Sequence, residues 1–348
     1  MSRSTLIHPL TEPPMHGHLL EVAPGVRWIR MPLPFALDHI NLWVLDDGEG
    51  VVLVDTGLGN DVTKALWDEI FAGPLAGKAV NRLIATHFHP DHMGLSGWLC
   101  EKLGVDLTAM MREWLFGRML WLEDSADFVA NQLHYYTRIG LDAEQLEGVK
   151  ERRNTYRSRI DVIPVRVIGI RHGDEMTIGG RIWRVIEGGG HSPEHACLYC
   201  EEAGLLISGD QVLPRISPIV GVWPQQPESE PLSLFLDALD RLRALPEDTF
   251  VLPSHGLPFQ GLHTRIDDLK AHHAERLEKT LGACSEAVTA VQVLKVLFTR
   301  PLDAHQLGFA TGETLAHLHH LMKLGSVVRT LDSNGVWRID SLSRYRAE

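Results

Sequence analysis

Four apolar segments of this chain are each followed by a histidine or an aspartate, and this pattern constrains the fold more than any other feature. The segments are NRLIAT, RIWRVIEGGG, LLISG and TFVLPS, and the residues that follow them are His87, His191, Asp210 and His255. Short hydrophobic runs bounded by glycine predict buried strands, and stretches with helical spacing lie between them. This alternation is typical of an α/β protein, in which polar side chains gather at the carboxyl ends of the strands.

The densest group of polar residues is THFHPDHMG, residues 86–94. In extended chain, residues i and i+2 point the same way, so His87 and His89 should leave the strand on one side. Pro90 ends the strand, and Asp91 sits where a helix would begin, a place that favours a carboxylate. His92 then turns toward a different point. The spacing predicts two adjacent metal positions.

Later strand ends supply the remaining ligands. A consistent allocation places His87, His89 and His191 on one metal and Asp91, His92 and His255 on the other, with the Asp210 carboxylate bridging them. Neutral imidazoles and carboxylates without a thiolate suit zinc, and also iron or manganese. We expect two divalent metal ions as cofactors, with zinc preferred. The other histidines, such as those at 272, 273, 317, 319 and 320, are interpreted as structural or surface residues.

Charge and cysteine content exclude several classes of function. The chain has 348 residues and a net charge of -12, which repels nucleic acid and anionic membranes. The N-terminus lacks the pattern of a signal peptide, and no apolar run reaches the length of a membrane span. Cys197 and Cys200 form a CxxC on a predicted strand, where they should point to opposite faces as buried thiols. We expect a cytoplasmic protein that acts on a small molecule, with a homo-oligomer left open.

The pattern of histidines, glycines and strands stops near residue 262. We predict a domain over 18–262, with a helical insertion at about 108–160, and a second domain over 263–348. The second domain should contain three helices closed by a hairpin that turns at Asn334 and Gly335, the outline of a winged helix.

The motif THFHPDH, followed by GHSPEH, SGD and SHG, resembles the metallo-β-lactamase-fold hydrolase superfamily, and VVLVDTG resembles its early Asp-Thr-Gly strand end. The resemblance implies a four-layer αββα sandwich, here with a helical insertion and a small C-terminal winged-helix-like domain. It also implies that Asp55 orients a ligand imidazole or the metal-bound solvent. For His195, a supporting role beside the ligands and simple strand packing both stay open.

The expected activity is hydrolysis of an ester-like bond by a metal-bridging hydroxide, with Asp91 accepting or returning a proton and Asp210 bridging. Asp210 distinguishes the chain from true β-lactamases of this fold, which generally lack the bridging aspartate. A thioester or lactone in a small, apolar substrate is the leading hypothesis. The alternatives are a phosphodiesterase or ribonuclease, an iron-dependent sulfur dioxygenase, and a non-enzymatic binding module with a vestigial site.

Residues 108–160 are rich in aromatic side chains. A lid over the metals would include Trp114, Phe116, Trp121, Tyr135 and Tyr136. In the alternative interpretation these aromatics only pack the inserted helices onto the sandwich. Arg215 could meet an anionic group of the substrate or be a surface charge. Glu194 stands where relatives commonly have glycine, which places a charged side chain near the site.

Overall fold

The computed structural model describes residues 6–342, which form two compact units. The first unit comprises residues 6–123, 155–218 and 238–266, and the second comprises 124–154, 219–237 and 267–342. Packing thus groups residues 124–154 and 219–237 with the C-terminal part of the chain. The domains predicted from the sequence instead have a single boundary, between residues 262 and 263. The described residues do not include 1–5, part of the N-terminus considered for a signal peptide. They also do not include 343–348, the end of the predicted second domain.

A seven-stranded sheet forms the first half of the first unit, in the order β1-β2-β3-β4-β5-β6-β7. Its strands are β1 (Leu19–Ala23), β2 (Val26–Pro32), β3 (His39–Asp47), β4 (Gly50–Val54), β5 (Val80–Ile84), β6 (Leu107–Met110) and β7 (Val167–Ile170). The strands from β1 to β4 pair antiparallel, and those from β4 to β7 pair parallel. A hairpin at the DDGEG turn connects β3 to β4.

A five-stranded sheet forms the second half, in the order β12-β11-β10-β9-β8. Its strands are β8 (Glu175–Ile178), β9 (Arg181–Glu187), β10 (Ala196–Cys200), β11 (Leu205–Gly209) and β12 (Phe250–Pro253). Only the pair β11 and β12 is parallel. The carboxyl ends of β11 and β12 therefore meet at one edge, which brings the residues that follow them together.

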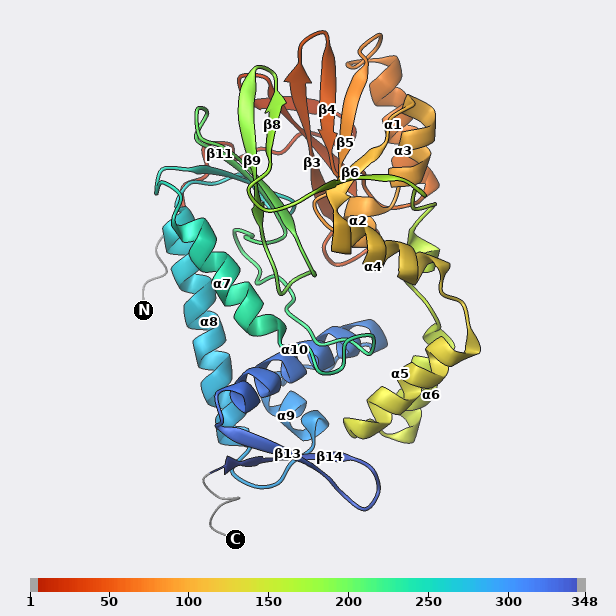
Figure 1. Cartoon of the computed structure of the whole chain (residues 1–348), viewed down its shortest axis with the longest axis vertical. Coiled ribbons are helices and arrows are strands. Elements are labelled where there is room, and N and C mark those ends of the chain that lie inside the picture. Colours follow the sequence, from red (N-terminus) through yellow and green to blue (C-terminus); the bar gives the residue numbers. More distant parts are fainter. Residues whose placement is uncertain (1–5, 343–348) are drawn as a thin grey trace. The chain divides into compact units, whose positions relative to one another are not determined.

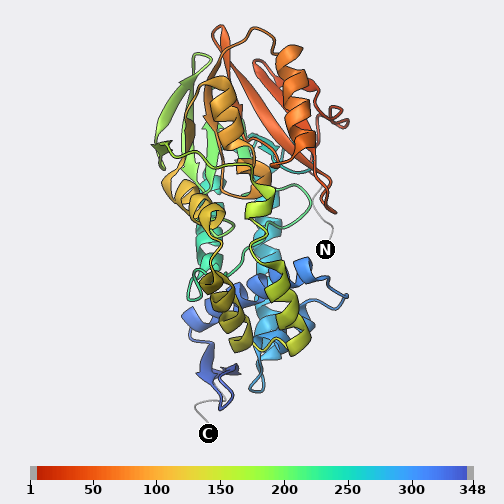
Figure 2. The ribbon, with the colours of Figure 1, turned by 90° about the vertical axis from the view of Figure 1, so that its right-hand side faces the viewer.

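The two sheets lie face to face in Figures 1 and 2, and their facing side chains form the hydrophobic core. Alternate residues of the strands point inward, as the period of two in a strand requires. Trp28 and Trp43 contribute from the first sheet, with ring centroids 6.2 Å apart, and Trp183 and Leu198 contribute from the second. Burial of this apolar surface is the main force that holds the sheets together.

Helices cover the outer faces of the sheets. Helices α1 (Asp61–Ala72) and α3 (Ser96–Leu103) pack on the seven-stranded sheet, as Figure 1 shows. The last turns of α7 (Pro231–Arg243) lie beside β9, where Arg241 Nε donates to Glu187 O at 3.1 Å. The expected αββα sandwich is confirmed. The short helix α2 (Pro90–Met93), helix α4 (Met111–Leu122) and the turn η1 (Arg157–Arg159) complete the first unit.

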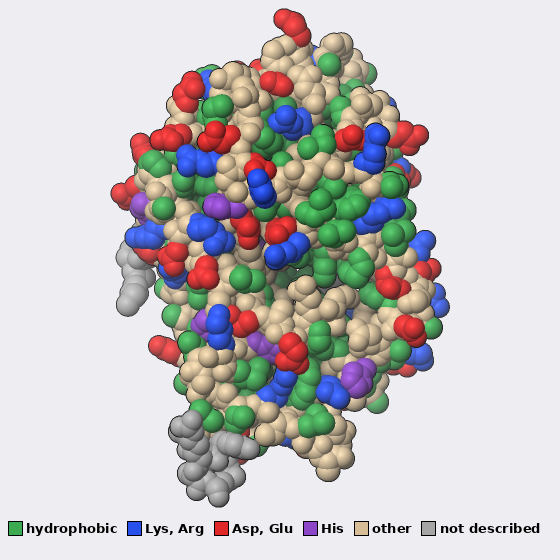
Figure 3. Space-filling view, in the orientation of Figure 1, with side chains coloured by type: hydrophobic (Ala, Val, Ile, Leu, Met, Phe, Trp, Pro, Cys, Tyr) green, Lys and Arg blue, Asp and Glu red, His purple; other side chains and the backbone are tan. Residues whose placement is uncertain are grey.

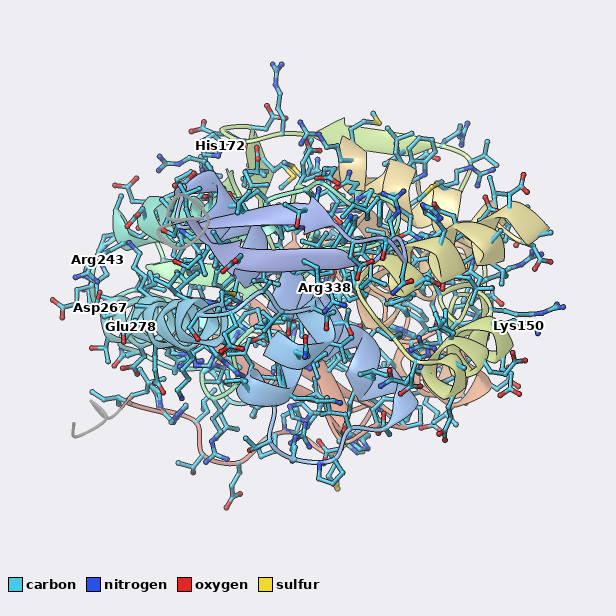
Figure 4. The ribbon with its side chains drawn as sticks, turned by 90° about the horizontal axis from the view of Figure 1, so that it is seen from below. Lys150, His172, Arg243, Asp267, Glu278 and Arg338 are labelled. Carbon is cyan, nitrogen blue, oxygen red and sulfur yellow. The ribbon has the colours of Figure 1, made fainter. Side chains whose placement is uncertain are left out.

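The second unit is mainly helical and ends in a hairpin. Its helices are α5 (Ala126–Arg138), α6 (Ala143–Arg152), most of α8 (Leu262–Ala283), α9 (Ala290–Leu297) and α10 (Ala304–Lys323). Strands β13 (Val327–Leu331) and β14 (Trp337–Ser341) pair antiparallel around Gly335, whose φ is 75°. The hairpin predicted at Asn334 and Gly335 is therefore confirmed. In Figure 4, Lys150 and Glu278 point away from α6 and α8.

Among residues 6–342 no helix combines the length and the apolar composition that a membrane crossing requires.

Candidate metal centre

The loop after β5 presents the densest set of candidate ligands. His87 and His89 lie on the bend between β5 and α2, with ring centroids 4.6 Å apart. His87 Nε2 and His89 Nδ1 are 2.8 Å apart, and His191 Nε2 lies 3.3 Å from His87 Nε2. Together with Asp210, these residues form the first group, whose ligand atoms all lie within 4.8 Å of one another.

Helix α2 turns the next two candidates toward a second point. Asp91 lies in its first turn, and His92 N–H donates to His89 O at 3.0 Å. His255, which follows β12, places Nε2 3.4 Å from Asp91 Oδ2. Asp91, His92 and His255 form the second group, again with ligand atoms within 4.8 Å of one another.

The Asp210 carboxylate lies between the two groups. Its Oδ2 is 3.4 Å from His191 Nε2 in the first group. Its Oδ1 is 3.4 Å from His255 Nε2 and 3.5 Å from His92 Nε2 in the second group. The two oxygens of one side chain therefore face different groups, as the bridging allocation requires.

Hydrogen bonds outside the cluster orient the imidazoles of the second group. Asp55 Oδ2 accepts from His92 Nδ1 at 2.8 Å, and His39 O accepts from His255 Nδ1 at 2.7 Å. These bonds place a proton on each Nδ1 and direct Nε2 at the cluster. The neighbouring carboxylates raise the pKa of His92 well above its usual value and that of His255 to about 10, so an ion at the second group would displace a proton from each Nε2. His39 is held in turn, because Gly256 N–H donates to its Nε2 at 2.9 Å.

His195 contacts the backbone of Asp210 rather than standing in either group. Asp210 N–H donates to His195 Nε2 at 3.0 Å, and His195 Nδ1 lies 3.5 Å from Cys197 Sγ. Gly209 permits this approach, since a Cβ there would lie 2.4 Å from the His195 ring. Of the two interpretations of His195, these contacts favour a supporting role beside a candidate ligand.

The glycine loop before His191 also allows a close approach. A Cβ on Gly188 would lie 2.3 Å from Gln211 Oε1. Gly189 N–H donates to that same oxygen at 3.0 Å, and Gln211 Nε2 donates back to Gly189 O at 3.2 Å. Gln211 thus ties the loop of His191 to the residue after Asp210.

The buried atoms of the cluster suit a metal ion. His92 Nε2 and Asp210 Oδ1 are both buried without a hydrogen-bond partner, an arrangement that is costly unless something else binds them. Burial lowers the pKa of His87 well below its usual value and that of His89 to about 3, so both rings are neutral with lone pairs available. Burial opposes ionisation of Asp91, but His92 and His255 outweigh it and hold the Asp91 pKa at about 2. Neutral imidazoles and ionised carboxylates are the donors that divalent ions of the zinc type prefer.

The aromatic residues of the predicted lid fall into two sets. In the first unit, Phe116 reaches the loop after β5, with its ring 5.0 Å from Phe88, whereas Trp114 Nε1 donates to Pro164 O at 2.9 Å. Trp121 lies near the end of α4, 5.9 Å from the Arg118 guanidinium.

The other set is buried inside the second unit. Tyr135 donates to Val222 O at 3.2 Å, and its ring contacts Tyr136 and Trp337. These contacts support the packing interpretation for Tyr135 and Tyr136. Arg215 is exposed.

Exposed apolar side chains follow one face of α4. They recur at the spacing of three to four residues that places side chains on one side of a helix. Hydrophobic side chains gather over α4 in Figure 3, and the exposed ones on this helix are Met111, Leu115, Met119 and Leu122.

Two further residues near the site were missed by sequence reasoning. Glu113 and Tyr156 are bonded to the backbone of Phe88, between His87 and His89. The only available signal was the position of Glu113, a carboxylate among the mainly apolar residues of α4. Glu194 does not point freely into the site, because its Oε2 accepts from Arg112 N–H at the start of α4.

Comparison with known proteins places this geometry in a family. The family model described as the metallo-beta-lactamase superfamily matches residues 36–255. A second model, described as the metallo-beta-lactamase-like C-terminal domain, matches residues 277–342. The first match includes every member of both ligand groups.

Solved structures support the match over almost the whole chain. A beta-lactamase domain protein from Burkholderia ambifaria is 43% identical, with a TM-score of 0.90, and the match covers 97% of this chain and 98% of that one. A metallo-beta-lactamase family protein from Thermus thermophilus is 32% identical, with a TM-score of 0.78, covering 92% of this chain and 100% of that one.

Curated relatives are more distant. A probable metallo-hydrolase from Bacillus subtilis is 25% identical over 89% of this chain and 96% of its own length. A hydroxyacylglutathione hydrolase from Erythrobacter litoralis is 26% identical over 70% of each chain. An atrochrysone carboxyl ACP thioesterase from Aspergillus fumigatus is 25% identical over 85% of this chain and 54% of its own length.

Proposed function

The chain belongs to the metallo-beta-lactamase superfamily of metallo-hydrolases, and from this premise we propose that it uses two divalent metal ions, preferably zinc, to hydrolyse a thioester or a lactone. One observation carries the proposal: the Asp210 carboxylate presents one oxygen to each ligand group, at 3.4 Å from His191 Nε2 and 3.4 Å from His255 Nε2. A site for a single ion would not need a carboxylate in that place.

Bound divalent ions would supply two effects, a lowered pKa of water and polarisation of the substrate carbonyl. The residues of the chain supply the rest. His87, His89 and His191 would hold the first ion, Asp91, His92 and His255 the second, and Asp210 would contact both. Asp91 is ionised and is the more exposed carboxylate, with 19% of its side chain accessible, against 10% for Asp210. Asp91 is therefore placed to accept a proton during attack and return it to the leaving group.

The substrate class is argued from relatives and from charge. Two relatives carry names of thioester hydrolases, one acting on hydroxyacylglutathione and one on an acyl carrier protein. A net charge of -12 opposes binding of RNA, because phosphate contacts need Lys and Arg.

The test combines metal analysis with a substrate panel of acyl-CoA thioesters, acylglutathione, lactones, p-nitrophenyl esters, bis-p-nitrophenyl phosphate and RNA. We expect about two metal equivalents per chain and the fastest turnover on a thioester or lactone. Asp210→Asn should lower the metal content toward one equivalent and kcat by at least about 100-fold, because it removes charge from both positions.

Asp248→Asn, an exposed aspartate of the same unit, is the matched control and should change neither quantity. Cleavage of phosphodiesters alone would favour the phosphodiesterase or ribonuclease alternative, and oxygen consumption with a thiol substrate would favour the sulfur dioxygenase. A metal content below one equivalent, with no effect of Asp210→Asn, would contradict the metallohydrolase itself.

A further inference from the structure

Both backbone groups of Phe88, its N–H and its carbonyl, form hydrogen bonds with side chains from other segments. Phe88 N–H donates to Glu113 Oε2 at 2.9 Å, and Tyr156 Oη donates to Phe88 O at 2.6 Å. The Phe88 ring also packs against Phe116 and Tyr156, with centroids 5.0 and 5.8 Å away. Phe88 stands between the two histidines that the loop contributes to the first group, so these contacts hold the stretch of backbone that carries both imidazoles.

The second oxygen of the same Glu113 carboxylate binds the other loop of the first group. Glu113 Oε1 accepts from Ser192 Oγ at 2.8 Å and from Glu194 N–H at 2.5 Å, just after His191. One carboxylate thus joins both loops that carry the histidines of the first group. Glu113 is fully buried, so its oxygens have these partners in place of water.

Helix α4 is itself attached to the loop that Glu113 binds. Glu194 Oε2 accepts from Arg112 N–H at 2.9 Å, and Glu194 Oε1 lies 3.1 Å from Arg112 Nε. A carboxylate that accepts from a backbone N–H in the first turn stabilises the start of a helix. Glu194 therefore fixes the start of α4 relative to the loop after His191, and with it the position of Glu113, the next residue of that helix.

The hydrogen bonds of Glu113 favour its ionised form, whereas its burial opposes ionisation. Burial raises its pKa to about 7, and the hydrogen bonds from Glu194, Ser192 and Phe88 oppose that rise. All three partners donate to the carboxylate, which matches an acceptor-only ionised group.

We propose that Glu113 and Tyr156 are positioning residues that set the geometry of the first ligand group and thereby the affinity of the first metal position. In the second group, Asp55 and His39 accept hydrogen bonds from the imidazoles of His92 and His255. Thr86 Oγ1 lies 3.1 Å from both His87 Nδ1 and His92 Nδ1, so the two groups are linked at that residue. The proposal rests on the two-metal function proposed above, and it adds that Glu113 and Tyr156 act mainly on the first position.

The test is Glu113→Gln, studied in the full chain. An amide offers one acceptor oxygen where the carboxylate offers two, so it cannot accept from both loops in the native geometry. We expect the first ion to bind at least about 10-fold more weakly and the second ion to lose clearly less affinity. Titration of the metal-free protein with Co²⁺ against a competing chelator measures both affinities, because the visible absorption of Co²⁺ reports its ligands.

Tyr156→Phe keeps the ring contacts and removes only the hydrogen bond to Phe88 O. It should therefore also lower the metal affinity of the first position, but by less than Glu113→Gln does. Two controls change groups of the same kind in the second unit, Glu313→Gln at a half-buried carboxylate and Tyr135→Phe at a buried hydroxyl. Both controls should leave the two affinities unchanged. Thermal unfolding of each metal-free variant shows that it is folded.

Equal weakening of both positions, or full wild-type loading of Glu113→Gln, would overturn the proposal. A loss of affinity that simply follows a loss of stability in the metal-free variants would also overturn it, since Glu113 would then be structural only. If the wild type itself binds a single ion, the two-metal function fails first and this proposal falls with it. Wild-type stoichiometry therefore separates the two failures.

Discussion

Asp55 shows how one residue can combine backbone strain with ligand support. Its φ of 65° lies in the left-handed region, which side chains other than glycine seldom adopt. The strain is offset by hydrogen bonds, because Oδ1 accepts from Thr86 N–H at 2.7 Å and Oδ2 accepts from His92 Nδ1 at 2.8 Å. A strained residue held by several bonds at a candidate site is an arrangement typical of function.

We predict that Asp55→Asn weakens metal binding at the second group. Asparagine tolerates the left-handed conformation, so the backbone should not change. Its amide keeps one acceptor oxygen and turns an NH2 toward either Thr86 N–H or His92 Nδ1, which disturbs the imidazole. The expected loss of affinity is about 10- to 100-fold, measured by competition with a chelator. An unchanged affinity would mean that His92 is oriented without Asp55.

At the scale of elements, helices α8 and α10 meet through a pair of buried histidines in the second unit. His273 Nδ1 and His317 Nε2 are 3.2 Å apart, and His317 Nδ1 donates to Glu313 O at 2.8 Å. His317 Nε2 is therefore the acceptor and His273 Nδ1 the donor, which requires a neutral His317 ring. His273 Nε2 is buried without a hydrogen-bond partner, which disfavours a second proton on that ring. The sequence analysis interpreted both as structural or surface residues, and neither belongs to a group of candidate metal ligands within the described residues.

This pair predicts a pH dependence of stability. Burial lowers the pKa of His273 to about 3 and that of His317 to about 4, against the usual histidine value of 6.5. The unfolded chain binds protons that the folded pair does not, so the free energy of unfolding should be highest above pH 6.5 and fall as the pH drops toward 4. The slope should approach about 1 kcal/mol per pH unit for each histidine, measured by urea unfolding at a series of pH values.

Replacement of both histidines by leucine should flatten this part of the profile, since the titrating groups are gone. His172→Gln serves as the control, because His172 is an exposed histidine of the first unit. A double variant with the wild-type slope would assign the pH dependence to other groups.

At the scale of the whole molecule, the two units differ in their candidate ligands. Both ligand groups lie in the first unit, and within residues 6–342 no further cluster of this kind is found in the second. A ligand that binds only the folded state of one unit stabilises that unit by mass action.

We therefore predict that chelation changes one unfolding transition more than the other. Removing ions present at about 1,000 times their dissociation constant would lower the stability of the first unit by about 4 kcal/mol. The melting temperature of that unit should fall by several degrees, while the transition of the second unit stays within about one degree. Differential scanning calorimetry with and without chelator measures this, and equal shifts of both transitions would contradict it.

The division into units marks one limit of sequence reasoning. The aromatic stretch 108–160 is continuous in the sequence, yet α4 belongs to the first unit while α5 and α6 belong to the second. Tyr135 and Tyr136 look like lid residues when only their neighbours in the chain are known. The partners of Tyr135, Val222 and Trp337, come from segments that packing alone brings together.

The local patterns of the sequence by themselves determined an α/β protein, the candidate ligands and their two points of convergence, and the family resemblance added the sandwich. The patterns could do so because strand period, turn glycines and strand-end polar residues are local signals, and the parallel strands carry their carboxyl ends to one edge. Only the tertiary structure decided that Glu194 accepts from the first turn of α4 and that Glu113 and Tyr156 hold the backbone of Phe88. These contacts join segments far apart in the chain, and their geometry depends on side-chain packing that no local pattern encodes.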